Sequence, residues 1–190
     1  SLSLSLSIKK TKKKIVNSNN FLNFKNRILL SYSWPLRSFP NYAQQLEMES
    51  LGKPANPKSI FKKTSQTIFG GFGPKAQHSY FQQLHQGTEN YSVDLFSNSE
   101  DRVDEKLISK QLQAQLTLFK NCPKELKGSQ EEVKANVNFN HFELAKIDPF
   151  HLGYLIALWE YRTFITAKIL QINPFDQFGV EAGKKLSEKL

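Results

Sequence analysis

A carboxylate and an amide four residues apart, Glu49 and Gln45, are the first side chains whose types and spacing could do chemistry. Residues 36–50 are expected to form a helix, in which positions four apart lie on one face. Glu49 would lie at the C-terminal end of this helix, where the helix dipole opposes a negative charge. A carboxylate in that setting suits a general base. The alternative is an ordinary solvated glutamate at a helix end.

His78 is the second candidate for proton transfer. It falls in the first turns of a helix expected over residues 74–86, where the helix dipole disfavours the imidazolium. A neutral histidine can both accept and donate a proton. The alternative is a hydrogen-bonded structural histidine. The sequence has no HxxxH pattern and no Cys/His ligand spacing, so we expect no metal site.

Gln177, Glu181 and Lys184 form a third set near the end of the sequence. Asn173 followed by Pro174 is a typical helix start, which predicts a helix over residues 174–190. On that helix the amide, the carboxylate and the ammonium project from one face. Such patterns are also common on solvated helices, so the alternative is an exposed stripe of ordinary polar residues.

The net charge of +9 is unevenly distributed along the 190 residues. The first 46 residues contain eight Lys and Arg and no Asp or Glu, which leaves 18 basic against 17 acidic residues in the rest. We therefore expect no nucleic-acid-binding face on the body of the protein. No apolar run approaches the roughly 20 residues of a membrane span. The single cysteine, Cys122, excludes an internal disulfide and suits a reducing compartment.

The hydrophobic pattern predicts strands that alternate with helices. The expected strands cover residues 27–33, 67–69 and 91–97, and the further expected helices cover 101–120 and 148–172. Gly52 is expected to end the helix at 36–50 in the left-handed conformation, and a glycine-rich turn is expected at 70–73. Asp148 and Pro149 are expected to begin the helix at 148–172. The alternation indicates an α/β layered fold with a parallel sheet.

Three strings in this sequence, in the same order, resemble glucose-6-phosphate isomerases. FDQFGVEAGK, residues 175–184, resembles the C-terminal signature of that family. QQLEMESLGK, residues 44–53, resembles the segment with its base catalyst, and AQHSYFQQLHQG, residues 76–87, resembles its histidine segment. The resemblance implies a layered sugar-isomerase (SIS) type fold with a mainly parallel sheet, incomplete, followed by C-terminal helices.

The resemblance also implies a reaction, the interconversion of glucose 6-phosphate and fructose 6-phosphate. Glu49 would shuttle a proton between C1 and C2 of the sugar through a cis-enediol. His78 and Lys184 would open the sugar ring, and Gln45 and Gln177 would position the substrate. No cofactor is implied, because the substrate carbonyl already acidifies the neighbouring proton. In the family the histidine is donated across a dimer interface, so a homodimer is expected.

Two features of the family are not found in the sequence, the Ser/Thr-rich phosphate cradle and the Gly-Gly-Arg motif. We therefore expect residues 28–190 to be the C-terminal part of an isomerase-like SIS domain, behind a low-complexity basic extension over residues 1–27 that is expected to be disordered. Alone the chain is expected to be weak or inactive, or to need a complementing N-terminal chain. The alternative is a non-catalytic sugar-phosphate-binding or assembly module that complements another chain.

Two smaller expectations concern location and one loop. The expected location is the cytoplasm, or an organelle if residues 1–14 act as a targeting segment, because basic, Ser-rich and acid-poor starts are typical of transit peptides. The ANVN string at residues 135–138 departs from a Gly-Asn-basic-Pro turn of the family, which predicts a changed loop there.

Overall fold

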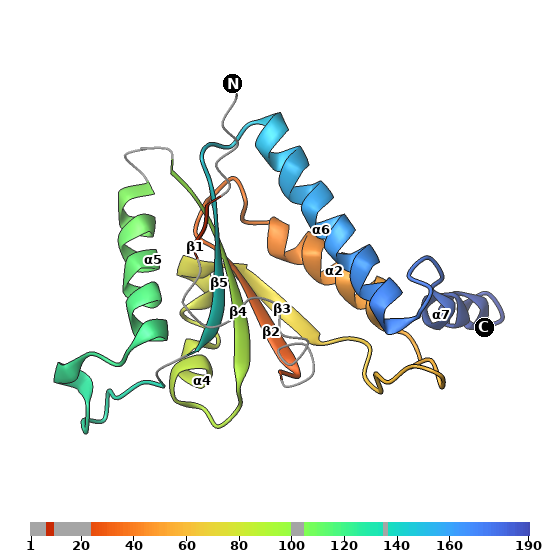
Figure 1. The fold of residues 1–190 in the computed structure, drawn as a ribbon, viewed down its shortest axis with the longest axis horizontal. Helices are drawn as coiled ribbons and strands as arrows, with labels where there is room; N and C mark the ends of the chain where they lie inside the picture. Colours follow the sequence, from red (N-terminus) through yellow and green to blue (C-terminus); the bar gives the residue numbers. More distant parts are fainter. Residues whose placement is uncertain (1–6, 10–23, 100–104, 135–136) are drawn as a thin grey trace.

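The computed structural model describes residues 7–9, 24–99, 105–134 and 137–190, which form a sheet with helices on both faces (Figure 1). The strand order is β1-β5-β4-β2-β3. β2, β3, β4 and β5 are mutually parallel, whereas β1 pairs antiparallel with β5. The mainly parallel α/β fold expected from the sequence is therefore confirmed. The strands are β1 (Ser7–Lys9), β2 (Asn26–Ser31), β3 (Thr67–Phe72), β4 (Tyr91–Asn98) and β5 (Asn138–Leu144).

β2 lies inside the sheet, and its sequence explains that position. Side chains alternate between the two faces of a strand. Ile28 and Leu30 belong to the core on one face, and Leu29 belongs to the core on the other. A parallel strand covered on both faces needs apolar residues at consecutive positions, which the RILL run supplies.

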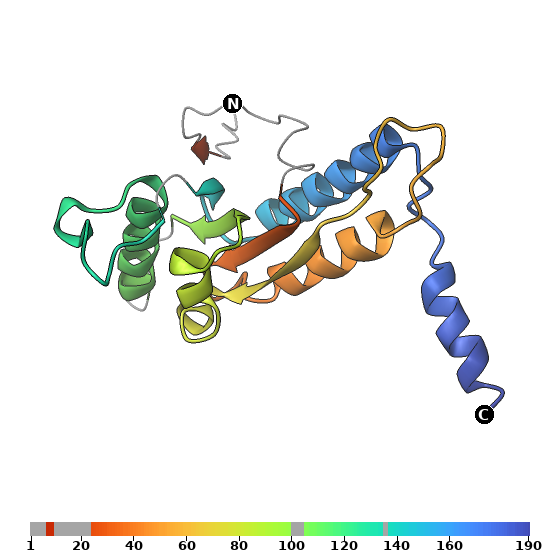
Figure 2. The same cartoon turned by 90° about the horizontal axis from the view of Figure 1, so that it is seen from below.

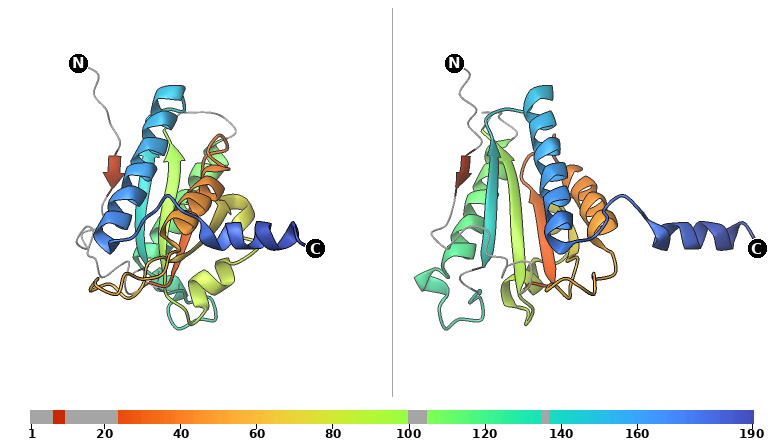
Figure 3. Two further views of the ribbon diagram at one scale, coloured as in Figure 1. Left: turned by 90° about the vertical axis from the view of Figure 1, so that its right-hand side faces the viewer. Right: turned by 45° about the vertical axis from the view of Figure 1, so that its right-hand side comes forward.

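Helices cover both faces of the sheet in two separate layers (Figures 1 and 3). α2 (Phe39–Leu51) and α6 (Pro149–Leu170) lie on one face. α3 (Gly73–Ala76), α4 (Phe81–Gln86) and α5 (Glu105–Lys120) lie on the other, and a short 3-10 helix, η1 (Lys124–Leu126), follows α5. The layer of α2 and α6 encloses an aromatic cluster in which Phe39, Phe96 and Trp159 have ring centroids 4.9–5.3 Å apart.

The start of α6 follows the prediction. Asp148 accepts a hydrogen bond from the His151 backbone N–H at 2.8 Å, and Pro149 occupies the first helical position. The backbone N–H of His151 and the basic side chains of Lys146 and His151 hold the pKa of Asp148 well below its usual range. Asp148 therefore stays ionised, as a cap facing the positive end of a helix should.

α7 (Phe178–Ser187) is separate from both layers. It projects away from the body of the protein, and all of its residues are exposed (Figures 2 and 3). The prediction of a helix beginning at Pro174 is wrong by four residues, because the Asn173 side chain accepts from the Phe175 backbone N–H within a non-helical segment instead of capping a helix. None of the helices described is long and apolar enough to cross a membrane.

The N-terminal region departs from the expected disordered extension over residues 1–27. Ser7–Lys9 form β1 of the sheet, and β2 begins at Asn26, two residues before the expected boundary at residue 28. Arg27, counted among the basic residues of the first 46, is buried in β2. The remaining part of the expected extension, residues 1–6 and 10–23, lies outside the described residues, as do 135–136 of the expected changed loop and 101–104 of an expected helix.

Two local predictions are wrong, and one strand was not predicted. Gly52 ends α2 at φ −73°, outside the left-handed region. Gly70 and Gly71 continue β3 instead of forming a turn, and a Cβ at Gly70 would come within 1.9 Å of the Leu29 carbonyl oxygen on the neighbouring strand. The sequence NFNHFEL, residues 138–144, forms β5, a strand that was not among those expected.

Candidate functional site

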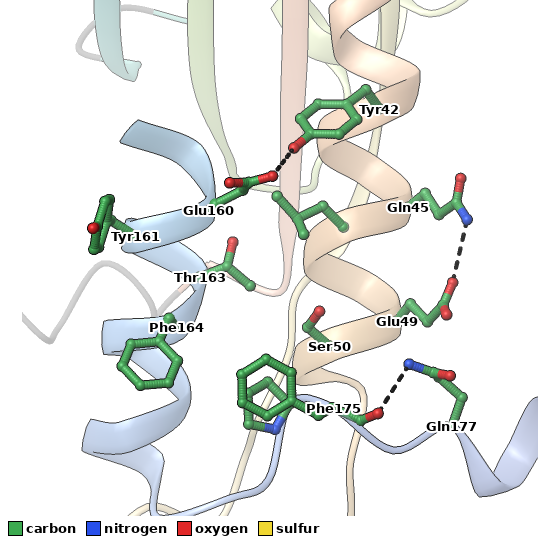
Figure 4. Close-up of a pocket in the computed structure, with 12 residues that line it drawn as sticks. Tyr42, Gln45, Glu49, Ser50, Glu160, Tyr161, Thr163, Phe164, Phe175 and Gln177 are labelled. Atoms are coloured by element: carbon green, nitrogen blue, oxygen red, sulfur yellow. Dashed lines mark hydrogen bonds between the residues drawn. The ribbon is translucent and has the colours of Figure 1, made fainter. Parts of the chain in front are cut away.

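A groove between α2 and α6 is the candidate site, and its volume is about 680 Å³. This volume falls within the roughly 300–1,000 Å³ range of small-molecule sites. Three segments form its walls, namely α2, α6 and the connection between α6 and α7 (Figure 4). The lining residues are Tyr42, Gln45, Leu46, Glu49, Ser50, Glu160, Tyr161, Thr163, Phe164, Pro174, Phe175 and Gln177.

α2 contributes the candidate base and its neighbour. Gln45 and Glu49 line the groove together, which confirms that they share a helix face. The Gln45 amide donates a long hydrogen bond to the Glu49 carboxylate, with 3.4 Å between Nε2 and Oε2. Glu49 is half-buried, so its carboxylate remains open to a ligand in the groove.

α6 forms the opposite wall, and sequence analysis did not single out its polar residues. Glu160 accepts a hydrogen bond from the Tyr42 hydroxyl at 3.2 Å, which joins the two helices at one end of the groove (Figure 4). Partial burial and the Glu160 carboxylate raise the pKa of Tyr42, so the phenol stays protonated. Helical spacing was the available signal, because Glu160, Thr163 and Phe164 lie three and four residues apart on one face.

The third wall is the arm, which we define as residues 173–177. Phe175 and Gln177 line the groove from the arm, and the Phe175 ring lies 6.1 Å from the Phe164 ring on α6. Gln177 lies beside Glu49 along one rim of the groove, where the Gln177 amide donates to the Phe175 carbonyl (Figure 4). The structure thus brings together three of the five predicted site residues, Gln45, Glu49 and Gln177.

The other two predicted residues, His78 and Lys184, do not line the groove. His78 lies in a turn between α3 and α4 and is exposed, so the prediction of one helix over residues 74–86 is wrong. Lys184 lies on α7 and is exposed. Gln177 precedes α7 as its N-cap residue, so the predicted helical face shared by Gln177, Glu181 and Lys184 is not formed.

A buried charge cluster lies between α2 and the sheet, behind the groove. Arg27 of β2 forms ion pairs with Glu47 of α2 and with Asp94 of β4, the latter at 3.2 Å. The Trp159 indole N–H donates to Glu47 at 2.7 Å. Because Glu47 and Glu49 are two residues apart on one helix, the cluster that holds Glu47 also fixes the rotation of α2 that turns Glu49 toward the groove.

Two charges in this cluster, those of Arg27 and Asp94, are kept ionised by their neighbours. Burial lowers the pKa of Arg27, but the Glu47 and Asp94 carboxylates outweigh burial and leave it raised. Burial raises the pKa of Asp94, but Arg27, Arg162 and a hydrogen bond from Asn140 outweigh burial and leave it lowered. The Asn140 bond is 2.8 Å long, and Arg162 donates to Asp94 at 3.3 Å. The cluster is therefore a charged scaffold rather than a proton-transfer site.

The charge of the groove is set by the side chains that line it. Within the described part of the chain, none of the side chains lining it is cationic. Nor do three or more His, Cys, Asp or Glu side chains of these described ranges gather where they could hold a metal ion. The groove offers two carboxylates, amides, hydroxyls and aromatic surface, which suit a polyhydroxylated ligand and proton transfer at carbon.

Comparison with known proteins connects this arrangement with one family. The family model described as phosphoglucose isomerase matches residues 14–190. A glucose-6-phosphate isomerase of Legionella pneumophila (strain Lens) is 35% identical over 175 residues, and the match covers 91% of this chain. The glucose-6-phosphate isomerase of Acinetobacter baylyi is 33% identical over 197 residues, again across 91% of this chain. In both cases the chain spans 35% of the relative's length.

Solved structures show the same relationship. A crystal structure of a glucose-6-phosphate isomerase from Chlamydia trachomatis superposes with a TM-score of 0.78 at 29% identity, and the match covers 90% of this chain and 35% of that one. A hypothetical protein of Thermus thermophilus shares the fold, with a TM-score of 0.70 at 22% identity over 88% of this chain and 41% of its own.

Proposed function

The chain belongs to the phosphoglucose isomerase family, and we propose that its groove forms part of a site that interconverts glucose 6-phosphate and fructose 6-phosphate. The observation that carries the proposal is the meeting of Gln45, Glu49 and Gln177 around one cavity, from two segments far apart in the sequence. We propose the cytoplasm as the location of this activity.

In this proposal Glu49 is the general base. It takes the proton from C2 of the open-chain aldose and returns it to C1, while a second proton moves from the C2 oxygen to the C1 oxygen, so that the aldehyde becomes the ketone through a cis-enediol. The half-buried position of Glu49 and the Gln45 amide at 3.4 Å support this role. Gln45 and Gln177 bind the sugar hydroxyls and hold the reacting carbons at the carboxylate.

The lack of a cationic side chain among the described lining residues should slow the isomerisation. A developing enediolate and a sugar phosphate are both anionic, and fixed cations near them are usually a large source of transition-state stabilisation. Because no side chain lining the groove within the described residues is cationic, we propose that the chain alone turns over weakly. Lys184, a second copy of this chain or a complementing N-terminal chain would supply the charge.

We propose that His78 acts in the groove of a second copy, within a homodimer. Its exposure and its absence from the lining of the groove support a role at another chain's site. Mixing inactive Glu49→Gln and His78→Asn chains tests this, because a mixed dimer contains one site with both residues intact. Recovery of turnover on mixing is expected, whereas two variants that stay inactive together would contradict the exchange of His78.

The test of the function is a coupled assay for conversion of fructose 6-phosphate to glucose 6-phosphate by the purified chain. Weak turnover is expected, and Glu49→Gln should abolish it. The matched control is Glu125→Gln, which removes an exposed carboxylate on η1 and should leave turnover unchanged.

The other outcomes are informative. Equal turnover by the chain and by Glu49→Gln would contradict the assignment of the base. Binding of fructose 6-phosphate without any turnover would favour the second candidate, a sugar-phosphate-binding module that complements another chain. The observation that favours this second candidate is that no cationic side chain lines the groove within the described residues, because turnover needs such a charge at the enediolate.

A further inference from the structure

We propose that Lys53 is a positioning residue, whose ammonium holds the arm against the C-terminal end of α2 and so keeps Gln177 beside Glu49. The inference rests on the proposed function only where it treats the groove as a sugar-phosphate site. The contacts that carry it are independent of what the groove binds.

The Lys53 ammonium contacts two segments that are far apart in the sequence. It donates to the Glu49 backbone carbonyl at 2.7 Å and to the Asp176 backbone carbonyl. Its Nζ also lies 3.6 Å from the Asp176 carboxylate. An ammonium has three N–H donors, of which two are used in these hydrogen bonds, and the Asp176 carboxylate adds an ion pair.

A lysine near a helix C-terminus often does no more than cap the last carbonyls. Lys53 differs from such a cap in two respects. Only 11% of its side chain is exposed, whereas a capping lysine normally keeps its charge in water. One of its two hydrogen-bond acceptors and its ion-pair partner also belong to the arm, so these contacts tie the arm to α2.

The backbone around Lys53 is itself fixed. Thr64 donates its hydroxyl to the Lys53 carbonyl at 2.6 Å, and the Lys53 N–H donates to the Leu51 carbonyl at 2.8 Å. The backbone from which the Lys53 side chain extends is therefore fixed at both its N–H and its carbonyl. A preorganised donor of this kind positions its partner more sharply than a free surface lysine.

The arm has few other attachments to the body. Pro174 is buried, and Phe175 meets Phe164 at 6.1 Å although its side chain is 74% exposed. Beyond the arm, α7 is fully exposed. Lys53 is thus a charged attachment of the arm at Asp176, and the residue after Asp176, Gln177, lines the groove.

Hydrogen–deuterium exchange on the whole 190-residue chain tests the attachment without requiring activity. Lys53→Met keeps the length of the side chain and removes its charge and its donors. Loss of charge-assisted bonds should make the amides of residues 175–180 exchange about tenfold faster, while those of β2 and β4 stay unchanged. Lys53→Arg should restore most of the protection, because a guanidinium keeps the charge and the donors.

The matched control is Lys62→Met. Lys62 lies in the same loop, but its ammonium contacts the Pro57 and Ser59 carbonyls at 3.4 and 2.9 Å, within that loop. It should leave exchange in the arm unchanged. Unchanged exchange in Lys53→Met would overturn the proposal, and so would an equal acceleration in β2 and β4, which would mark a general loss of stability.

Titration with fructose 6-phosphate then asks whether Lys53 acts through Gln177. Lys53→Met and Gln177→Ala should each weaken binding, and the double variant should bind no more weakly than Gln177→Ala alone. Additive losses would overturn the positioning role. If the unaltered chain binds no fructose 6-phosphate, the proposed function fails, whereas the exchange result still decides whether Lys53 holds the arm.

Discussion

The two walls that bring Glu49 and Gln177 together are built in opposite ways. α2, which carries Glu49, lies on the sheet over a buried ion-pair cluster and an aromatic core. The arm, which carries Gln177, has one buried residue, Pro174, and a charged attachment at Lys53. The candidate base is thus held by the core of the protein, while the candidate substrate-binding amide is held by a local contact.

This difference predicts two levels of stability within one site. Elements that share a core unfold together, whereas segments with few buried contacts open at lower free energy. The arm should therefore detach from the groove at a lower free energy than is needed to unfold α2. The cluster around Arg27 should control global unfolding, and contacts of the arm should control only local opening.

The largest expected effect comes from the buried cluster. Arg27→Met removes the cation shared by Glu47 and Asp94 and leaves two buried carboxylates without it. Removing one partner of a buried ion pair usually costs about 3–5 kcal/mol of unfolding free energy. Chemical denaturation followed by circular dichroism measures this loss.

Arg37→Met is the control for Arg27→Met. Arg37 is exposed, stacks over the Trp34 ring at 4.3 Å and donates to the Trp34 carbonyl. Its loss should change the unfolding free energy by less than about 1 kcal/mol. Equal effects of the two substitutions would show that the cluster does not dominate the stability of the α2 wall.

The second effect is the response of the cluster to acid. Because the pKa of Asp94 is lowered in the folded protein, its ionisation adds stability that is fully present above the unfolded pKa of about 3.9. This contribution is lost as pH falls below that value and through the folded pKa. Asp94→Asn should be less stable than the unaltered chain at pH 6, and the difference should shrink toward pH 3.

Urea denaturation midpoints at a series of pH values measure that difference. The effect should be smaller than that of Arg27→Met, because an asparagine keeps the shape of the side chain and can still accept from Asn140. A difference that stays constant from pH 6 to pH 3 would contradict a role for the ionised carboxylate.

The sequence predicted the wall built on the core much better than the wall built on the arm. Glu49 and Gln45 share a face because helical periodicity requires it, and the strand expected over residues 27–33 corresponds to β2. Asp148 and Pro149 identified the start of α6 in the same local way. In each of these cases nearby residues determine the structure.

The failures come from contacts that are remote in the sequence. β5 contains Asn140 and His141, which look like loop residues until Asn140 bonds Asp94 and His141 meets Ser97 at 2.7 Å inside the sheet. Gly70 looks like a turn residue until Leu29 of the next strand excludes a side chain. Polar side chains are buried when they have a hydrogen-bond partner, but the local sequence around them does not show which remote residue is the partner.

The break at His78 and the late start of α7 have the same kind of cause. Tyr80 leaves the helical conformation at φ −137°, and its ring packs against Phe69 of β3 at 5.1 Å. Asp176 is bound by Lys53, 123 residues earlier in the chain, within an arm that is not helical although local signals favoured a helix. Both interactions lie beyond what local periodicity can predict.

A third prediction concerns the aromatic contact of the arm. Phe175→Leu keeps apolar surface but removes the ring that meets Phe164. An aromatic pair contributes about 0.5–1.5 kcal/mol beyond its buried area. Hydrogen exchange at residues 175–180 should rise by a few-fold or more, and the global denaturation midpoint should stay where it is. A lowered midpoint would mean that the arm unfolds together with α2.

The smallest expected effect lies at the end of the arm, in α7. Gly183 is an interior residue of this helix, and a Cβ there would meet no atom within 4 Å. Gly183→Ala should stabilise the helix by about 0.5–1 kcal/mol, because alanine loses less backbone entropy on ordering. Since every residue of α7 is exposed, the gain should appear only as slower amide exchange at residues 178–187. A raised midpoint of global denaturation would instead show that α7 unfolds together with the core. The local opening proposed for the arm would then not extend beyond Gln177 into α7.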